Sequence, residues 1–253
     1  VEELAGLLDR IRPPTLEAKN TVWLVNRNRG ATSAVKESSL AIKVDAARHL
    51  FDVKCNRMAW VIIDSGIEAD HPAFAQRDEQ GGLTNKSRVK ATYDFTRIRQ
   101  LLNPSNLTPH NENLPEYLKI LLAREDSRAR ELQKDLQEFR RFLKRGRELD
   151  WELLEPLLQI PHNDNYVRPL NSHGTHVAGI LAADWPEEGL HGMCPDLQLY
   201  DFRVLNDDGT GDEFNVIAAL QFIRYLNATH DYMMIHGCNL SLSVRHDVAN
   251  YAC

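Results

Sequence analysis

The sequence predicts an α/β protein with a mostly parallel sheet and helices on both faces, plus a long helical insertion. Strand-like and helix-like segments alternate along most of the chain, the pattern of a parallel sheet with crossover helices. Residues 59–63 (AWVII) form a continuous apolar run with the length of a buried strand. Between Pro115 and Gly146 there is neither Gly nor Pro, and apolar residues recur in steps of four and three.

Three elements are expected before this apolar run. One-sided apolar residues predict a helix near residues 1–20, which the pair Pro13-Pro14 interrupts. Residues 21–26 (TVWLVN) have the composition of a short strand, and residues 44–51 follow a helical period. The apolar stripe of this second helix consists of Val44, Ala47, Leu50 and Phe51.

The segment without Gly or Pro predicts one long helix with a coiled-coil-like seam. Residues 151–158 predict a shorter helix that folds back on it. We expect a solvated insertion packed on the main domain, with a dimerisation or partner-binding arm as the alternative. The seam consists of Leu118, Leu122, Ala129, Leu132, Leu136, Phe139 and Leu143.

After Pro161 the alternating pattern resumes. A helix over residues 173–183 precedes a strand over 197–204, a helix over 215–226 and a strand over 238–243. We expect the helix over 215–226 to turn Val216, Ile217, Leu220, Ile223 and Leu226 inward.

The composition is ordinary for a soluble globular protein, with 43% hydrophobic and 26% charged residues. A net charge of -6 gives no reason to expect nucleic acid or an anionic membrane as a partner. The chain starts at Val1 without a visible signal peptide, although an upstream signal could be missing. Four cysteines fit no zinc or CxxC pattern, so free thiols are favoured over a structural disulfide, and the expected location is cytoplasmic.

Asp64 and His173 are the candidate catalytic residues. Asp64 ends the apolar strand, where a partly desolvated carboxylate needs hydrogen-bond donors or a positive partner. A histidine is a natural partner, because the carboxylate accepts its ring N–H and fixes its tautomer. Taken alone, Asp64 could form a turn or cap, and His173 with His176 could be two metal ligands on one helical face, although no third ligand is evident.

Four segments together resemble the subtilisin-like serine proteases. VIIDSGIEADHP is similar to the aspartate motif of that family, and NSHGTHVAGILAA to its histidine motif. GMCPDLQLYDFRVLNDDGTGDEFNVIAALQFI resembles the segment after the histidine helix, and CNLSLS a strand of the form Asn-x-Ser-Leu. The resemblance implies a subtilisin-like, incomplete fold and hydrolysis of peptide bonds by an Asp-His-Ser triad, in that chain order.

The resemblance also implies a role for each matching residue. Asp64 would orient His173, which would act as general base and then as general acid. Backbone groups on two sides would hold an extended peptide or protein substrate. These are Gly209, Thr210 and Gly211 on one side and Ser241, Leu242 and Ser243 on the other. No cofactor is expected.

The sequence departs from the family in three ways. No Gly-Thr-Ser motif occurs, so we expect the 253 residues alone to be inactive although the parent protein is an enzyme. Asp64 and His173 are 173 − 64 = 109 positions apart, mostly because of the helical insertion, and such surface insertions are tolerated. Ala73 stands where the family often has a calcium-binding aspartate, so no metal is expected there.

We therefore expect four parts. Residues 1–40 are an amino-terminal lead-in, 41–113 the aspartate part of a catalytic domain, 114–160 the helical insertion, and 161–253 the histidine part without a serine segment. The alternative function is a pseudoprotease or regulatory binding module that holds a protein partner. The insertion at 114–160 would then serve partner binding or self-association.

Overall fold

The computed structural model describes residues 41–78, 80–108, 111–124, 126–145, 149–164 and 166–243. These residues belong to one compact unit. The predicted helix near residues 1–20 and the predicted strand over 21–26 lie outside the described residues.

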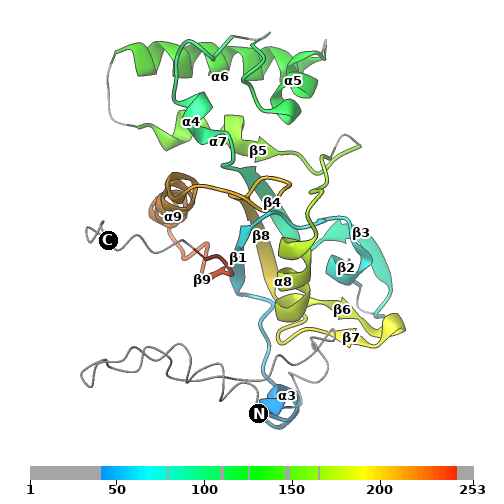
Figure 1. Ribbon diagram of the computed structural model, residues 1–253. Helices are drawn as coiled ribbons and strands as arrows, with labels where there is room; N and C mark the ends of the chain where they lie inside the picture. Colours follow the sequence, from blue (N-terminus) through cyan, green and yellow to red (C-terminus); the bar gives the residue numbers. More distant parts are fainter. Residues whose placement is uncertain are drawn as a thin grey trace, which may run out of the picture. The chain divides into compact units, whose positions relative to one another are not determined.

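A five-stranded sheet in the order β5-β4-β8-β1-β9 forms the centre of the described part (Figure 1). Strand β1 (Ala59–Asp64) is parallel to β8 (Gln198–Arg203) on one side and to β9 (Gly237–Leu240) on the other. Strand β4 (Val89–Asp94) is parallel to β8, and only the short β5 (Gln159–Ile160) runs antiparallel. The mostly parallel sheet predicted from the sequence is confirmed.

Strand β1 is buried on both faces because a helix covers each face of the sheet. Alternate residues of a strand point in opposite directions, so Val61 and Ile63 join one apolar cluster and Ile62 joins another. Helix α9 (Glu213–Ala228) contributes to the first cluster and helix α8 (His173–Ala182) to the second (Figure 1). This two-sided burial explains the uninterrupted apolar run in the sequence.

Helix α9 forms where the sequence predicts it, but the inward face is different. Ile217 and Leu220 are 50% and 36% exposed, so their predicted inward orientation is wrong. Ala218 and Ala219 face the sheet instead, because small side chains let the helix backbone approach closely. The buried residues of α9 are Asn215, Ala218, Ala219, Phe222 and Leu226.

The insertion contains three helices, so the prediction of one long helix is wrong. Helix α5 (Glu116–Leu122) ends before α6 (Ser127–Lys144), and α7 (Trp151–Leu158) folds back on α6 as expected. The break has a local cause, because the side chain of Asp126 accepts a hydrogen bond from the backbone N–H of Ala129 and caps a new helix.

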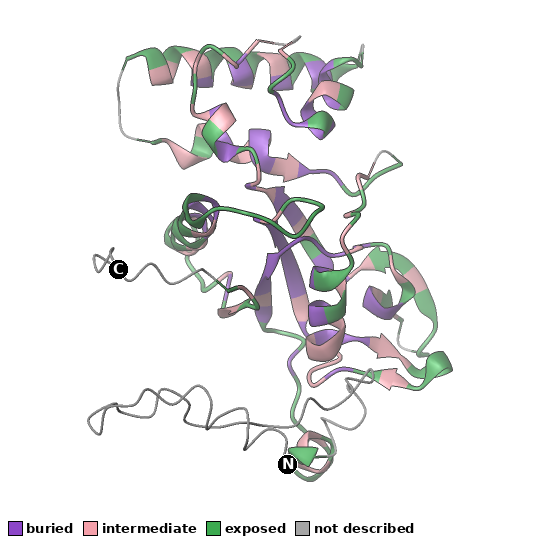
Figure 2. Ribbon diagram, viewed as in Figure 1, coloured by how far each residue is buried: buried purple, intermediate pink, exposed green. Residues whose placement is uncertain are grey.

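Most of the predicted seam is buried despite this break. The buried members, coloured purple in Figure 2, belong to the same apolar cluster as one face of the sheet, apart from Ala129. The Tyr117 hydroxyl donates a hydrogen bond to the Leu157 carbonyl and joins α5 to α7. The insertion is therefore packed on the main core, and its role as a partner-binding arm stays a prediction.

Short elements surround this core. Helix α3 (Val44–Phe51) forms as predicted, but Leu50 and Phe51 are each 75% exposed, so its apolar stripe is not buried by the described residues. The remaining elements are the short helices η1 (Pro72–Phe74), α4 (Ile98–Leu101) and η2 (Pro186–Glu188), the hairpin of β2 (Ala75–Arg77) and β3 (Leu83–Ser87), and the hairpin of β6 (Asp184–Trp185) and β7 (Leu190–His191).

Candidate active site

The structure brings together the two residues that the sequence singles out. Strand β1 ends at Asp64 and helix α8 begins at His173, so both side chains lie at the same edge of the sheet. Nδ1 of His173 is 2.8 Å from Oδ1 and 3.0 Å from Oδ2 of Asp64. Because an ionised carboxylate only accepts hydrogen bonds, Nδ1–H is the donor and Nε2 keeps its lone pair.

Asp64 and His173 differ sharply in exposure. The side chain of Asp64 is 1% exposed, whereas that of His173 is 50% exposed. The buried carboxylate also accepts a hydrogen bond from the backbone N–H of Ser65 at 2.7 Å, which fixes its position. The pair therefore consists of a fixed, buried acid and an imidazole that solvent or a ligand can reach.

Two residues that the sequence analysis missed hold the start of α8 against the end of β1. The hydroxyl of Ser65 accepts a hydrogen bond from the N–H of Gly174 at 3.1 Å and lies 3.2 Å from the carbonyl oxygen of Asn171, to which it donates. The side-chain oxygen of Asn171 accepts from the N–H of His173 at 2.9 Å. An Asn two residues before a helix commonly makes such a turn contact, so the role of Asn171 could have been predicted from the sequence.

A buried ionic network lies beneath the Asp64 turn. Arg203 donates to Oδ2 of Asp201 at 3.1 Å, to the Tyr166 hydroxyl at 2.9 Å and to the Val167 carbonyl at 2.8 Å. The Tyr166 hydroxyl in turn donates to the carbonyl of Ile67 at 2.6 Å. The network ties the segment before α8 to the segment after β1. No sequence pattern pointed to it.

Burial raises the pKa of Asp201, which is completely enclosed. Its second oxygen, Oδ1, has no hydrogen-bond partner among the described residues. The charge of Arg203 acts in the opposite direction and favours the ionised carboxylate. Asp201 and Arg203 therefore form a desolvated ion pair, in which the charge of each side chain is stabilised by the charge of the other.

A cavity of about 600 Å³ opens beside His173. All six predicted substrate-binding residues line it: Gly209, Thr210, Gly211, Ser241, Leu242 and Ser243. Asn171, Leu205, Asp212, Glu213 and Val216 complete the lining. The structure thus places the predicted binding residues around one space next to the exposed imidazole.

The backbone of the 209–211 segment is held by a turn. Oδ1 of Asp208 accepts from the N–H of Thr210 at 2.8 Å and from its hydroxyl at 2.6 Å. The N–H of Asn206 donates to the carbonyl of Thr210 at 2.7 Å. Gly209 has a φ of 77°, which favours glycine at this position. These contacts fix the groups that would face a bound chain.

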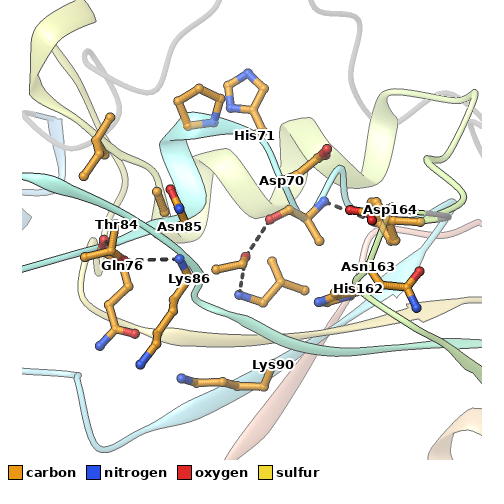
Figure 3. A pocket seen from close by; sticks show the side chains of 17 residues that line it. Asp70, His71, Gln76, Thr84, Asn85, Lys86, Lys90, His162, Asn163 and Asp164 are labelled. Carbon is orange, nitrogen blue, oxygen red and sulfur yellow. Dashed lines mark hydrogen bonds between the residues drawn. The ribbon is translucent and has the colours of Figure 1, made fainter.

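Three other cavities in the described part of the chain are not lined by His173, and two of them are larger than the cavity beside it. One of about 750 Å³ is bounded by the β2–β3 hairpin and the segment around His162, with Lys86 and Lys90 in its wall (Figure 3). Another of about 1040 Å³ lies beside helix α5 and reaches Ser65. Neither of these two cavities is lined by Asp64 or His173.

No metal site is evident in the described part of the chain. No group of three or more His, Cys, Asp and Glu side chains there is arranged to hold an ion. Nδ1 of His173 is engaged by Asp64, and His176 is exposed.

None of the helices within the described ranges combines the length and apolar character that crossing a bilayer requires.

Residues 61–250 match the family model described as "Subtilase family", and this match covers most of the chain. The chain belongs to the subtilase family. This subtilase chain carries Asp64 and His173 in the order that the family resemblance implied.

Curated proteases are similar to parts of this subtilase chain. The minor extracellular protease Epr of Bacillus subtilis (strain 168) is 32% identical over 82 residues, which is 32% of this chain and 13% of Epr. The thermophilic serine proteinase of Bacillus sp. (strain AK1) is 32% identical over 91 residues, 36% of this chain and 22% of that protein. An intracellular serine protease of Paenibacillus polymyxa is 40% identical over 52 residues, 21% of this chain and 16% of that protein. The matched segments thus span less than a quarter of these relatives.

Among solved structures, the CspB protease of Clostridium perfringens is similar to this subtilase chain with a TM-score of 0.46 and 17% sequence identity. The similarity covers 85% of this chain and 35% of the CspB chain.

Proposed function

We propose that the protein containing these residues is a serine endopeptidase of subtilisin type, which hydrolyses peptide bonds with an Asp-His-Ser triad. The observation that carries this proposal is the 2.8 Å contact between Nδ1 of His173 and the buried carboxylate of Asp64. An imidazole held in this way, half exposed beside a cavity, has the arrangement of a general base in acyl transfer.

His173 would move the proton. With Nδ1–H directed at Asp64, Nε2 can accept the proton of a serine hydroxyl and later deliver it to the leaving amine. Within the described ranges, Nε2 makes no hydrogen bond, so it is free to meet a hydroxyl. The buried carboxylate would stabilise the imidazolium that forms during transfer.

Residues 209–211 and 241–243 would hold the substrate. Both segments line the cavity beside His173. An extended peptide bound between them would pair with backbone groups of each segment. The substrate class is therefore a peptide or protein, with side-chain pockets setting preference.

A serine and an oxyanion donor would complete this site. We infer that both come from outside the described residues, because CNLSLS resembles a family strand that precedes the serine motif. A single oxyanion donor supplies about 2.7–4 kcal/mol of transition-state stabilisation, so the 253-residue chain alone should show at most residual turnover.

The test is a casein-hydrolysis assay of the complete gene product, with a fluorophosphonate probe for an activated serine. Asp64→Asn should lower kcat by about 10⁴-fold, because it removes the orientation of the base. His173→Ala should lower kcat by about 10⁶-fold, because it removes the base itself. His176→Gln is the matched control, since His176 is an exposed histidine one turn along α8, and it should keep most activity. If the wild type showed no turnover and no labelling by the probe, the proposal would be contradicted and the binding-module alternative favoured.

A further inference from the structure

We propose that Cys55 and Cys194 form a thiol pair that closes to an intramolecular disulfide when the protein meets a small-molecule disulfide such as oxidised glutathione. The two cysteines are 139 positions apart in the sequence, and both are free thiols in the structure. The proposal concerns a part of the fold away from the His173 cavity and does not depend on the proposed function.

The register of the sheet places the two cysteines side by side. Cys55 lies four positions before Ala59, the first residue of β1, and Cys194 lies four positions before Gln198, the first residue of β8. Ala59 and Gln198 are direct partners in the parallel ladder. The two cysteines therefore occupy equivalent positions on neighbouring chain segments.

The turns that follow the cysteines are alike. The N–H of Met58 donates to the carbonyl of Cys55 at 2.8 Å, and the N–H of Leu197 donates to that of Cys194 at 3.0 Å. The N–H of Cys55 also donates to Oδ2 of Asp196 at 2.7 Å, which joins one turn to the other. Neighbouring strands lie about 4.8 Å apart, and disulfides join Cα atoms separated by about 4.4–6.8 Å, so equivalent positions suit a disulfide.

The two thiols share one apolar environment. Cys55 belongs to the apolar cluster beneath α8, and Cys194 packs against the same cluster. Burial, together with the neighbouring Cys194 thiol, raises the pKa of Cys55 to about 11. Cys194 is more accessible than Cys55, which is 7% exposed. Cys194 is therefore the thiol that a small disulfide reaches first.

The reaction is two successive exchanges. The Cys194 thiolate attacks one sulfur of the small disulfide, which forms a mixed disulfide and releases one small thiol. Cys55, as its thiolate, then attacks the Cys194 sulfur and releases the second small thiol. Two S–H bonds of the protein are replaced by one S–S bond, and the small disulfide is reduced to two thiols that carry the two protons.

The bond would join two segments that carry the Asp64–His173 pair. Cys55 precedes the strand that ends at Asp64. Cys194 follows the helix that begins at His173, and its N–H donates to the carbonyl of Leu181 near the end of that helix at 2.7 Å. The closed loop therefore contains both members of the pair.

The test uses the whole chain, equilibrated with oxidised glutathione, quenched in acid, alkylated and digested for mass spectrometry. The wild type should lose two of its four thiols and yield one cross-linked product that contains Cys55 and Cys194. Cys194→Ser should retain the Cys55 thiol, whereas the control Cys238→Ser should still form the bond. Four intact thiols, only mixed disulfides with glutathione, or a cross-link through another cysteine would overturn the proposal.

A second readout does not depend on any variant. Closure of the mixed disulfide requires the Cys55 thiolate, which faces Cys194, Asp196 and Arg48. Below the pKa of Cys55, the closure rate should rise about tenfold per pH unit between pH 7 and pH 9. Oxidised protein should also melt at a higher temperature than protein treated with dithiothreitol. A pH-independent closure rate or an unchanged melting temperature would argue against a buried attacking thiol and against a closed loop.

Discussion

The backbone of Gly174 lies directly against the backbone of Gly66. A Cβ at position 174 would lie 2.5 Å from the carbonyl oxygen of Gly66 and 2.9 Å from its nitrogen. This contact brings the start of the histidine helix against the turn that follows Asp64. The 2.8 Å bond between His173 and Asp64 depends on it, because neither backbone segment can yield without moving a member of the pair.

Gly174→Ala should destabilise the chain and disturb the Asp64–His173 pair. The added methyl group meets backbone atoms rather than a flexible side chain, and overpacking of this kind costs about 1–3 kcal/mol. Urea unfolding of the 253-residue chain measures the loss. In the complete gene product, kcat against casein should fall as well.

Gly179→Ala is the matched control in the same helix. A Cβ at position 179 meets nothing within 4 Å. Replacing this glycine should stabilise the chain by about 0.5–1 kcal/mol, because alanine favours the helix. Equal effects of the two substitutions would show that the Gly174 contact does not hold the pair.

Asp94 makes stability depend on pH. Burial raises its pKa, partly offset by hydrogen bonds from the N–H and hydroxyl of Thr96 and by the charges of Arg203 and Arg97. The folded state therefore binds the proton more tightly than the unfolded state, whose pKa is about 3.9. This contribution to stability is present below pH 3.9 and is lost as pH rises through the folded pKa.

The measurement compares urea midpoints of the wild type and Asp94→Asn from pH 3 to pH 7. Relative to Asp94→Asn, the wild type should lose stability with rising pH. Thr96→Ala removes the hydroxyl donor to the carboxylate, so it should widen the pH range of this loss. Parallel pH profiles for all three proteins would contradict the inferred burial of the charge.

Arg203→Met should be strongly destabilising because it leaves the buried carboxylate of Asp201 without its cation. Breaking such a pair by removing one partner costs about 3–5 kcal/mol. The double variant Asp201→Asn/Arg203→Met should recover part of this loss, since no uncompensated charge remains. Urea unfolding of the two single variants and the double variant gives the coupling, and strict additivity would exclude a direct interaction.

Phe139→Ala should test whether the insertion belongs to the main core. Phe139 is completely buried on α6, so its replacement by Ala should lower the free energy of unfolding by about 3–5 kcal/mol. Ile120→Ala, at a position 39% exposed on α5, should cost less than about 1 kcal/mol. A separate early transition in the Phe139→Ala melt, with the rest unchanged, would indicate an independently folding insertion.

Sequence patterns predicted the parts of this structure that depend on local chemistry. The apolar run ending at Asp64 and the helix beginning at His173 are local signals, and in the structure the two side chains lie within hydrogen-bond distance. The break between α5 and α6 depends on one capping side chain, Asp126, which the longer apolar period masked.

Contacts between distant segments could not be predicted in the same way. The inward face of α9 depends on where small residues let the helix approach the sheet. Ala218 and Ala219 are therefore buried, whereas the larger Ile217 and Leu220 are exposed. The ion pair between Asp201 and Arg203 is local in sequence, yet its buried state follows from what packs above it. Neither feature produces a periodic pattern in the sequence from which it could be predicted.

The sheet has unequal ends. At one margin, β5 contributes only two residues, at the end of the insertion. At the other margin, β9 contributes four residues and leaves its outer backbone groups unpaired by any described strand. A further strand, whether from the same polypeptide or another, finds a usable template only beyond β9. The sheet can therefore be extended by a further strand at its β9 edge, beside the cavity, and hardly at all at its β5 edge, beside the insertion.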